Sequence, residues 1–208
     1  MNNNILKQVN DYYSDKITQN GATPEGVDWN STESQYLRFK VLSNIIDKDE
    51  NFTVLDYGCG FGSMYDFLKK SYTNFNYTGY DISQKMIDAA LEFYPNDNNS
   101  NWLNSLNNSK KYDYTIASGI FNVRLKNSDE KWLNYITETL HKIDNLSKMG
   151  FAFNILTKYS DKEYMRDYLY YADPLFLFDY CKKHFSKNVA LLHDYNLYEF
   201  TIIVRKNG

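Results

Sequence analysis

The spacing of apolar residues predicts an alternation of strands and helices along most of the chain. From Glu33 to Asp47 apolar residues recur at helical spacing, and Ser31 or Thr32 precedes them as a candidate N-cap. Beyond this helix, short apolar runs bounded by turn residues predict strands, and amphipathic stretches predict the helices between them. In order, the predicted elements are strand 52–56, helix 63–70, strand 76–81, helix 83–93, strand 101–103, strand 112–118, helix 129–146 and strand 151–156.

The C-terminal part predicts a helix and two closely connected strands. After a long connection rich in aromatic residues, Pro174–His184 has a helical pattern, and a short turn then joins Asn188–His193 to Glu199–Arg205. Alternating strand and helix units demand a parallel sheet with helices on both faces, whereas the short last connection makes its two strands antiparallel. We therefore expect an α/β fold with a seven-stranded, mostly parallel sheet.

The length and the segment boundaries predict one compact domain with an N-terminal extension. The 208 residues, 43% of them apolar, are enough for one substantial core, and no linker interrupts them. Gly21–Asn30 combines glycines and a proline with Trp29, which is typical of a loop able to fold over a pocket. We expect residues 1–32 to form a lid or cap and residues 33–208 to form the main domain.

Composition and charge favour a small-molecule partner in the cytoplasm. The net charge of −3 argues against a nucleic-acid surface, which requires clustered Lys and Arg. No stretch predicts a membrane span, and the first residues lack the pattern of a secretory signal. Cys59 and Cys181 match no metal or disulfide spacing. The 20 Tyr and 13 Phe reflect either compositional bias or a pocket for a cation or an aromatic ring.

The segment Val54–Gly62 carries the most informative motif. An apolar strand ends at Asp56, and Gly58, Gly60 and Gly62 follow at every second position. Glycines at this spacing let the backbone turn sharply and approach a ligand closely, and the helix that follows offers unpaired N–H groups. The motif therefore predicts a nucleotide-binding turn.

A second acid follows the next predicted strand. Asn76–Asp81 ends in Asp81, 19 residues after Gly62. In nucleotide-binding α/β folds, a carboxylate at this position reaches ribose hydroxyls. The glycine turn and the second acid therefore fit one ligand.

These two motifs and the terminal pair of strands resemble the class I S-adenosylmethionine-dependent methyltransferases, over roughly residues 33–205. The resemblance implies a Rossmann-like sheet ordered 3-2-1-4-5-7-6, with strand 7 antiparallel. It also implies that S-adenosylmethionine binds across the C-terminal ends of strands 1 to 4 and leaves as S-adenosylhomocysteine. The expected activity is methyl transfer to an oxygen or nitrogen of a small molecule.

The resemblance assigns roles to the two motifs. Asp56 would orient the glycine turn and the methionine amine, Asp81 would accept both ribose hydroxyls, and Ile82 would flank the adenine. The backbone would pass close to the cofactor at three glycines: Gly58, Gly60 and Gly62.

Further cofactor contacts are expected from three other places. After the third strand, Trp102 would stack on the adenine and Asn104 would bond its edge, although a structural role for the tryptophan is an equal alternative. After the fourth strand, Ser118 and Gly119 would approach the sulfonium. Arg38 would bind the cofactor's carboxylate, unless it lies on a solvated helix face.

His193 is the candidate catalytic base if the acceptor is a hydroxyl, with an ordinary turn histidine as the alternative. Alignment of the reactants is the main requirement in either case. One alternative function is an NAD(P)-dependent oxidoreductase, but its third glycine would fall at Ser63. A nucleic-acid methyltransferase would need a basic arm and an Asn/Asp-Pro-Pro-aromatic motif, both absent. A protein that binds S-adenosylmethionine without methyl transfer remains the third alternative.

Overall fold

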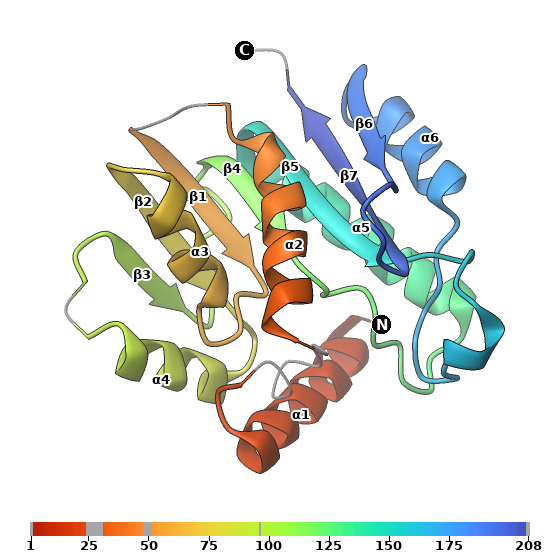
Figure 1. Cartoon of the computed structure of the whole chain (residues 1–208), viewed down its shortest axis with the longest axis horizontal. Helices are drawn as coiled ribbons and strands as arrows, with labels where there is room; N and C mark the ends of the chain where they lie inside the picture. Colours follow the sequence, from red (N-terminus) through yellow and green to blue (C-terminus); the bar gives the residue numbers. More distant parts are fainter. Residues whose placement is uncertain (1, 24–30, 48–50, 96, 207–208) are drawn as a thin grey trace.

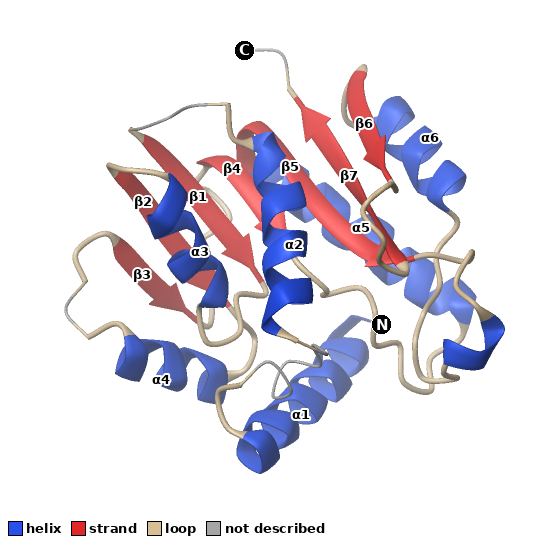
Figure 2. Cartoon of the chain, in the orientation of Figure 1, coloured by secondary structure: helices blue, strands red, loops and turns tan. Residues whose placement is uncertain are grey.

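The computed structural model describes residues 2–23, 31–47, 51–95 and 97–206. Most of the predicted loop at 21–30 therefore lies outside the described residues. The described part forms one seven-stranded sheet flanked by helices (Figures 1 and 2). None of the described helices combines the length and apolar character that crossing a bilayer requires.

The sheet has the predicted order, β3-β2-β1-β4-β5-β7-β6. β1, β2, β3, β4 and β5 pair in parallel, and β7 runs antiparallel to both β5 and β6. The fold expected from the strand and helix pattern is thus confirmed. The strands are β1 (Phe52–Tyr57), β2 (Phe75–Tyr80), β3 (Ser100–Leu103), β4 (Tyr112–Ala117), β5 (Ser147–Leu156), β6 (Asn188–Leu192) and β7 (Glu199–Arg205).

Helices cover both faces of the sheet and bury two main cores. On one face the buried residues Phe39, Leu68 and Ile87 come from α2, α3 and α4, and on the other Trp132 and Leu177 come from α5 and α6. Figure 1 shows α2 and α3 in front of the strands and α5 behind them. The bounds are α2 (Thr32–Leu42), α3 (Ser63–Ser71), α4 (Gln84–Phe93), α5 (Asp129–Leu146) and α6 (Pro174–His184), with short 3-10 turns η2 (Ser43–Ile45) and η3 (Lys162–Tyr164).

Two elements differ in length from their prediction. β5 begins at Ser147 rather than at residue 151, because Gly150 continues the strand with φ +155° instead of ending it. α2 ends at Leu42, and η2 replaces the last turn of the predicted helix. The Ser31 side chain caps α2 by accepting a hydrogen bond from the Ser34 N–H at 3.2 Å.

An additional helix, α1 (Asn2–Asn20), precedes the predicted elements. Its buried residues Ile5, Val9 and Ile17 are four or eight positions apart, so they lie on one face. Ile5 and Val9 join the core that α5 and α6 bury. Figure 1 shows α1 below the C-terminal ends of the central strands, where it covers that edge of the sheet.

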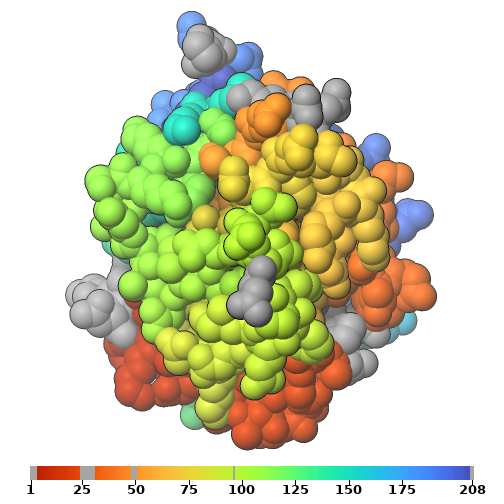
Figure 3. Space-filling view, turned by 90° about the vertical axis from the view of Figure 1, so that its left-hand side faces the viewer, coloured from red at the N-terminus to blue at the C-terminus, as the bar shows by residue number. Residues whose placement is uncertain are grey.

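Polar contacts fasten α1 to the start of α4. The hydroxyls of Ser14 and Ser83 are 2.8 Å apart, and Lys85 Nζ donates to Thr18 Oγ1 at 2.7 Å. Figure 3 shows the red N-terminal residues beside the yellow-green residues of α4. Apolar packing against the core of α5 and α6 and polar contacts with α4 therefore both hold α1 on the domain.

The turn after β1 has a backbone that favours glycine and leaves no room for a side chain. Gly62 has φ +97°, and a Cβ there would lie 2.5 Å from the Trp102 ring and 2.7 Å from the Tyr94 ring. The left-handed conformation and the crowding therefore act together at Gly62.

We expect Gly62→Ala to lower the free energy of unfolding by about 2–5 kcal/mol, since a left-handed residue costs roughly 1–2 kcal/mol and overpacking adds roughly 1–3 kcal/mol. Gly21→Ala is the matched control, because Gly21 has φ +68° and nothing within 4 Å of an added Cβ. It should cost only about 1–2 kcal/mol. Urea unfolding of the two variants measures the difference, and equal costs would show that Trp102 and Tyr94 exert no steric constraint.

Candidate functional site

One large cavity lies at the C-terminal ends of β1, β2 and β4, between the sheet and α1. Its volume is about 900 Å³. Ligand pockets usually span roughly 300–1,000 Å³, so this space is large enough for two small molecules side by side. Position also favours a site, because ligands of open α/β sheets bind beyond the carboxyl ends of the strands.

Asp56 lies at the end of β1 and is 2% exposed. Its Oδ2 accepts a hydrogen bond from Tyr77 Oη at 2.6 Å. Burial raises the pKa of Asp56 to about 7, because the Tyr77 hydrogen bond only partly offsets desolvation and the charge of Asp81 raises it further. Such a carboxyl favours a cationic or hydrogen-bond-donating partner.

Asp81 directly follows β2 and joins the glycine turn to the next helix. Its Oδ2 accepts from the Gly60 N–H at 3.0 Å, and its Oδ1 accepts from the Ser83 N–H at 2.8 Å. Burial raises the pKa of Asp81 to about 6, while these two backbone hydrogen bonds lower it. Two acids with raised pKa values, the buried Asp56 and the partly buried Asp81, therefore line one end of the cavity.

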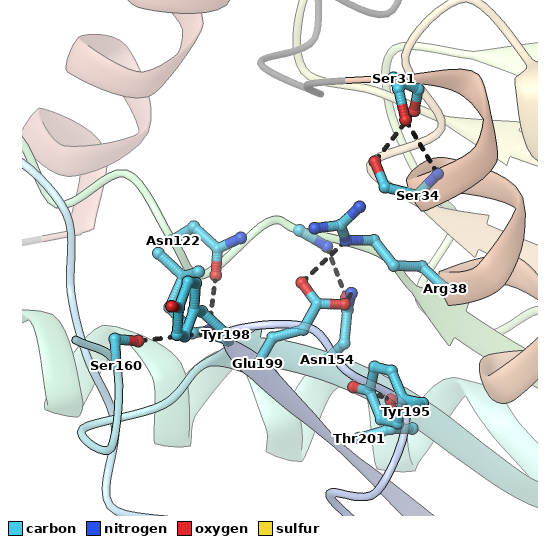
Figure 4. A network of polar contacts seen from close by, with 12 residues as sticks. Ser31, Ser34, Arg38, Asn122, Asn154, Ser160, Tyr195, Tyr198, Glu199 and Thr201 are labelled. Carbon is cyan, nitrogen blue, oxygen red and sulfur yellow. Dashed lines mark hydrogen bonds and ion pairs between the residues drawn. The ribbon is translucent and has the colours of Figure 1, made fainter. Parts of the chain in front are cut away.

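A chain of buried polar groups positions the turn after β4. Gly119 N donates to Asn154 Oδ1, Asn154 Nδ2 donates to Glu199 Oε1, and Arg38 Nε donates to Glu199 Oε2, each at 2.8 Å. Figure 4 shows this chain running from α2 through β7 and β5 to the β4 turn. It fixes Gly119 beside Ser118, whose buried Oγ has no hydrogen-bond partner within the described part of the chain.

Asn154 and Glu199 are site-supporting residues that the sequence prediction missed. Asn154 is fully buried within β5 among apolar residues, and Glu199 is almost fully buried as the first residue of β7. For Asn154 the interruption of an apolar run was the available signal, because a polar residue inside such a strand needs a partner.

Most of the sequence-predicted site residues line this cavity. Together they come from α2, the three central strand ends and the turns after them: Arg38, Asp56, Gly58, Gly60, Asp81, Ile82, Ser118 and Gly119. The structure does not bring four others to the cavity wall: Gly62, Trp102, Asn104 and His193.

Gly62 and Trp102 lie on the core side of the glycine turn. The Trp102 ring stacks on Tyr94 with centroids 5.2 Å apart, and its Nε1 donates to Ser100 Oγ at 3.2 Å. The ring fills the space beneath Gly62 and Gly79, so it supports the turn from below. This arrangement corresponds to the structural role that the sequence left open for the tryptophan.

Asn104 and His193 lie at the surface. Asn104 Nδ2 donates to Gln84 Oε1, which directs the amide toward α4. His193 follows the edge strand β6, which β5 and β7 separate from β4, and its ring packs near Tyr159 and Phe200. His193 begins the β6–β7 turn, but its ring lies near Tyr159 and Phe200, whereas Asn196, Leu197 and Tyr198 of the same turn line the cavity.

The other end of the cavity is walled by segments outside the central strands. These are α1, the 157–173 connection and the β6–β7 turn, which contribute Val9, Tyr13, Tyr164, Tyr168 and Tyr198 among others. Asn122 lies between the two ends. Its Oδ1 accepts from Leu156 N at 3.1 Å, and Figure 4 shows its amide nitrogen on the side that faces Arg38.

The raised pKa values predict how stability depends on pH. A carboxyl with a folded-state pKa above its unfolded value stabilises the fold at low pH, and this contribution is lost as pH rises through the folded pKa. For Asp56 the loss falls between about pH 4 and about pH 7. We expect Asp56→Asn to reduce the fall in melting temperature between pH 5 and pH 8, measured by circular dichroism without ligand.

The exposed acid Asp88 provides the control for this measurement. Asp88→Asn should show the same fall as the unmodified protein. An unchanged fall in Asp56→Asn as well would contradict the assignment of a raised pKa to Asp56.

Comparisons with known proteins agree with this geometry. The profile of a family described as a methyltransferase domain matches residues 55–148. The chain is 48% identical over 162 residues to a Mycobacterium tuberculosis protein named "Putative methyltransferase Rv1506c". The aligned region covers 78% of this chain and 98% of that protein.

Solved methyltransferases share the fold. Magnesium protoporphyrin IX methyltransferase from Synechocystis PCC 6803, solved with bound S-adenosylhomocysteine, has a TM-score of 0.65 at 15% identity, covering 96% of this chain and 99% of that chain. The DhpI complex with S-adenosylhomocysteine has a TM-score of 0.67 at 12% identity, covering 98% and 97%. On the strength of the 48% identical relative and the matching fold, the chain belongs to the class I S-adenosylmethionine-dependent methyltransferases.

Proposed function

We propose that the protein transfers a methyl group from S-adenosylmethionine to an oxygen or nitrogen of a small-molecule acceptor. The observation that carries this proposal is the single cavity with two chemically different ends. One end has the glycine turn and two acids with raised pKa values, and the other has tyrosines and segments from outside the central sheet. Family membership itself decides against the NAD(P)-dependent oxidoreductase.

The acid-bearing end fits the cofactor. S-adenosylmethionine has an ammonium group and two ribose hydroxyls, which are the partners that Asp56 and Asp81 require. We assign the amine to Asp56, the hydroxyls to Asp81 and the adenine flank to Ile82. The unpartnered Ser118 Oγ supports a further polar contact at this end.

Three more contacts complete the proposed cofactor site. Gly58 and Gly60 allow the backbone to approach the ligand, and Gly119 does the same at the β4 turn. Arg38 is the proposed partner of the cofactor's carboxylate. Its Nε bond to Glu199 holds the guanidinium in place at the cavity wall.

The sulfonium supplies an electrophilic methyl group, and the protein supplies position. The hydrogen bond from Gly60 N to Asp81 holds the turn after β1, and the hydrogen bond from Gly119 N to Asn154 holds the turn after β4. Together these turns would fix the place where the methyl group is presented. Holding two reactants in line in this way lowers a barrier by about 7–11 kcal/mol. Because His193 lies outside the cavity, we assign it no catalytic role.

Residues 1–32 form the proposed cap over the acceptor. α1 buries Ile5 and Val9 against the domain and lines the cavity with Tyr13. A covered cavity excludes water, which would otherwise compete for the acceptor's hydrogen bonds. The net charge of −3 and the absence of a basic arm in the sequence favour a small acceptor over nucleic acid.

We expect Asp81→Asn to weaken S-adenosylmethionine binding about 10- to 150-fold, because hydrogen bonds to a charged group contribute about 1.5–3 kcal/mol. Isothermal titration calorimetry measures the change. Asp88→Asn is the control, since Asp88 is exposed on α4 and lies outside the cavity. Equal affinities of Asp81→Asn and the unmodified protein would overturn the proposed role of Asp81.

Methyl transfer itself is tested by incubating the protein with methyl-labelled S-adenosylmethionine and a small-molecule cell extract. We expect a labelled small molecule from the unmodified protein and from His193→Gln, and little label from Asp81→Asn. Liquid chromatography with mass spectrometry identifies the product. Cofactor binding without any labelled product would favour a binding protein, and loss of activity in His193→Gln would restore the histidine as a base.

A further inference from the structure

We propose that the methyl acceptor is an aromatic acid whose anionic group is bound by Arg166 at the mouth of the cavity. This inference rests on the proposed function, because it describes the occupant of the acceptor end. Three observations carry it: the distribution of charge along the cavity, the fixed position of Arg166, and the exposed tyrosines around it.

The charged residues that line the cavity are two acids and three cations. The acids Asp56 and Asp81 lie at the glycine turn, whereas the cations are Lys16, Arg38 and Arg166. Arg38 is largely compensated by its buried bond to Glu199. Lys16 lies between Ser14 and Thr18, which fasten α1 to the start of α4. Arg166 on the 157–173 connection therefore supplies the positive charge at the acceptor end, which favours an anion there.

Arg166 is held in place by its own segment. Its Nη1 donates to the carbonyls of Glu163 and Met165 at 3.0 and 2.9 Å, and its backbone N–H donates to Tyr171 Oη at 2.9 Å. Among the residues that the structure describes, no carboxylate forms an ion pair with Arg166. A positioned guanidinium without an internal counterion is suited to bind a carboxylate from a ligand.

Tyrosines surround Arg166 at the same mouth. Tyr164, Tyr168 and Tyr198 are 57%, 44% and 43% exposed although each lines the cavity. The rings of Tyr164 and Tyr198 lie 5.7 Å apart with an interplanar angle of 32°. Exposed rings gathered at one opening offer stacking and edge contacts to a planar ligand.

A cationic acceptor is the main competitor, since tyrosine rings also attract ammonium groups. Such a ligand would lie close to Arg166, and like charges repel. The nearby acids Asp161, Glu163 and Asp167 do not line the cavity, so a ligand inside it meets the guanidinium rather than these carboxylates. Charge therefore selects the acid over the amine.

The test compares three probes that share one ring: 4-hydroxybenzoate, 4-hydroxybenzamide and 4-hydroxybenzylamine. Each is titrated by NMR into protein saturated with S-adenosylhomocysteine. We expect the acid to bind at least about 10-fold more tightly than the amide, and the amine to bind most weakly. A charge-assisted hydrogen bond accounts for a factor of about 10 to 150.

Variants of Arg166 test whether this residue causes the preference for the acid. Arg166→Gln should weaken binding of the acid about 10-fold or more, and Arg166→Lys should give an intermediate affinity, because lysine keeps the charge but not the bidentate geometry. Lys162→Gln is the matched control, since Lys162 is exposed on the same connection and lies outside the cavity. It should bind the acid as the unmodified protein does.

Several outcomes would overturn the inference: tighter binding of the amine, equal binding of all three probes, no binding of any probe, or an Arg166→Gln variant that binds the acid normally. S-adenosylmethionine affinity, measured on the same protein preparations before S-adenosylhomocysteine is added, separates this failure from failure of the proposed function. Intact cofactor binding with the wrong acceptor preference refutes only the aromatic acid. Loss of cofactor binding in the unmodified protein would refute the proposed function itself.

Discussion

The site depends on the hydrogen bonds that tie the turn after β1 to the end of β2. Gly58 N and Cys59 N both donate to the Tyr80 carbonyl, at 2.7 and 3.0 Å, and Gly60 N donates to the carboxylate of Asp81. Because three successive N–H groups are directed at one strand end, the glycine turn cannot move independently of Asp81. The two motifs that lie far apart in the sequence therefore act as one rigid unit beside the cavity.

The second turn of the site is held by a buried ion pair. Burying Arg38 and Glu199 carries a desolvation cost, and an apolar pair of similar size would often stabilise the fold as well or better. An apolar pair could not accept the hydrogen bond that Asn154 Nδ2 donates to Glu199. This bond orients the Asn154 amide, whose Oδ1 accepts a hydrogen bond from Gly119 N. We infer that the pair is retained because it positions the β4 turn, since it joins α2, β7 and β5 at that point.

The sequence predicted the strands and helices from local apolar runs and part of the cavity wall from the acids at strand ends, whereas the sheet order came from the family resemblance. It missed α1, whose apolar residues recur every four positions but are separated by Asn, Asp and Lys, so that only packing against the domain shows their common face. For Trp102 and His193 the sequence left two roles open, and local signals could not decide between them. A short strand does not reveal which face meets the core, and residue order within a turn does not reveal which side chains line the cavity.

The separation of charge along the cavity gives the two ends different requirements. Asp56 is buried and Asp81 is partly buried, and among the described residues neither forms an ion pair, so desolvation of these carboxylates costs stability and favours a ligand with an ammonium group and hydroxyls. Arg166 places a positive charge on the 157–173 connection at the other end. In the proposed arrangement, a molecule bound at the wrong end would meet a like charge. The proposed charge pattern would thus favour one order of the two ligands along the cavity, and methyl transfer requires the two reactants to lie in line.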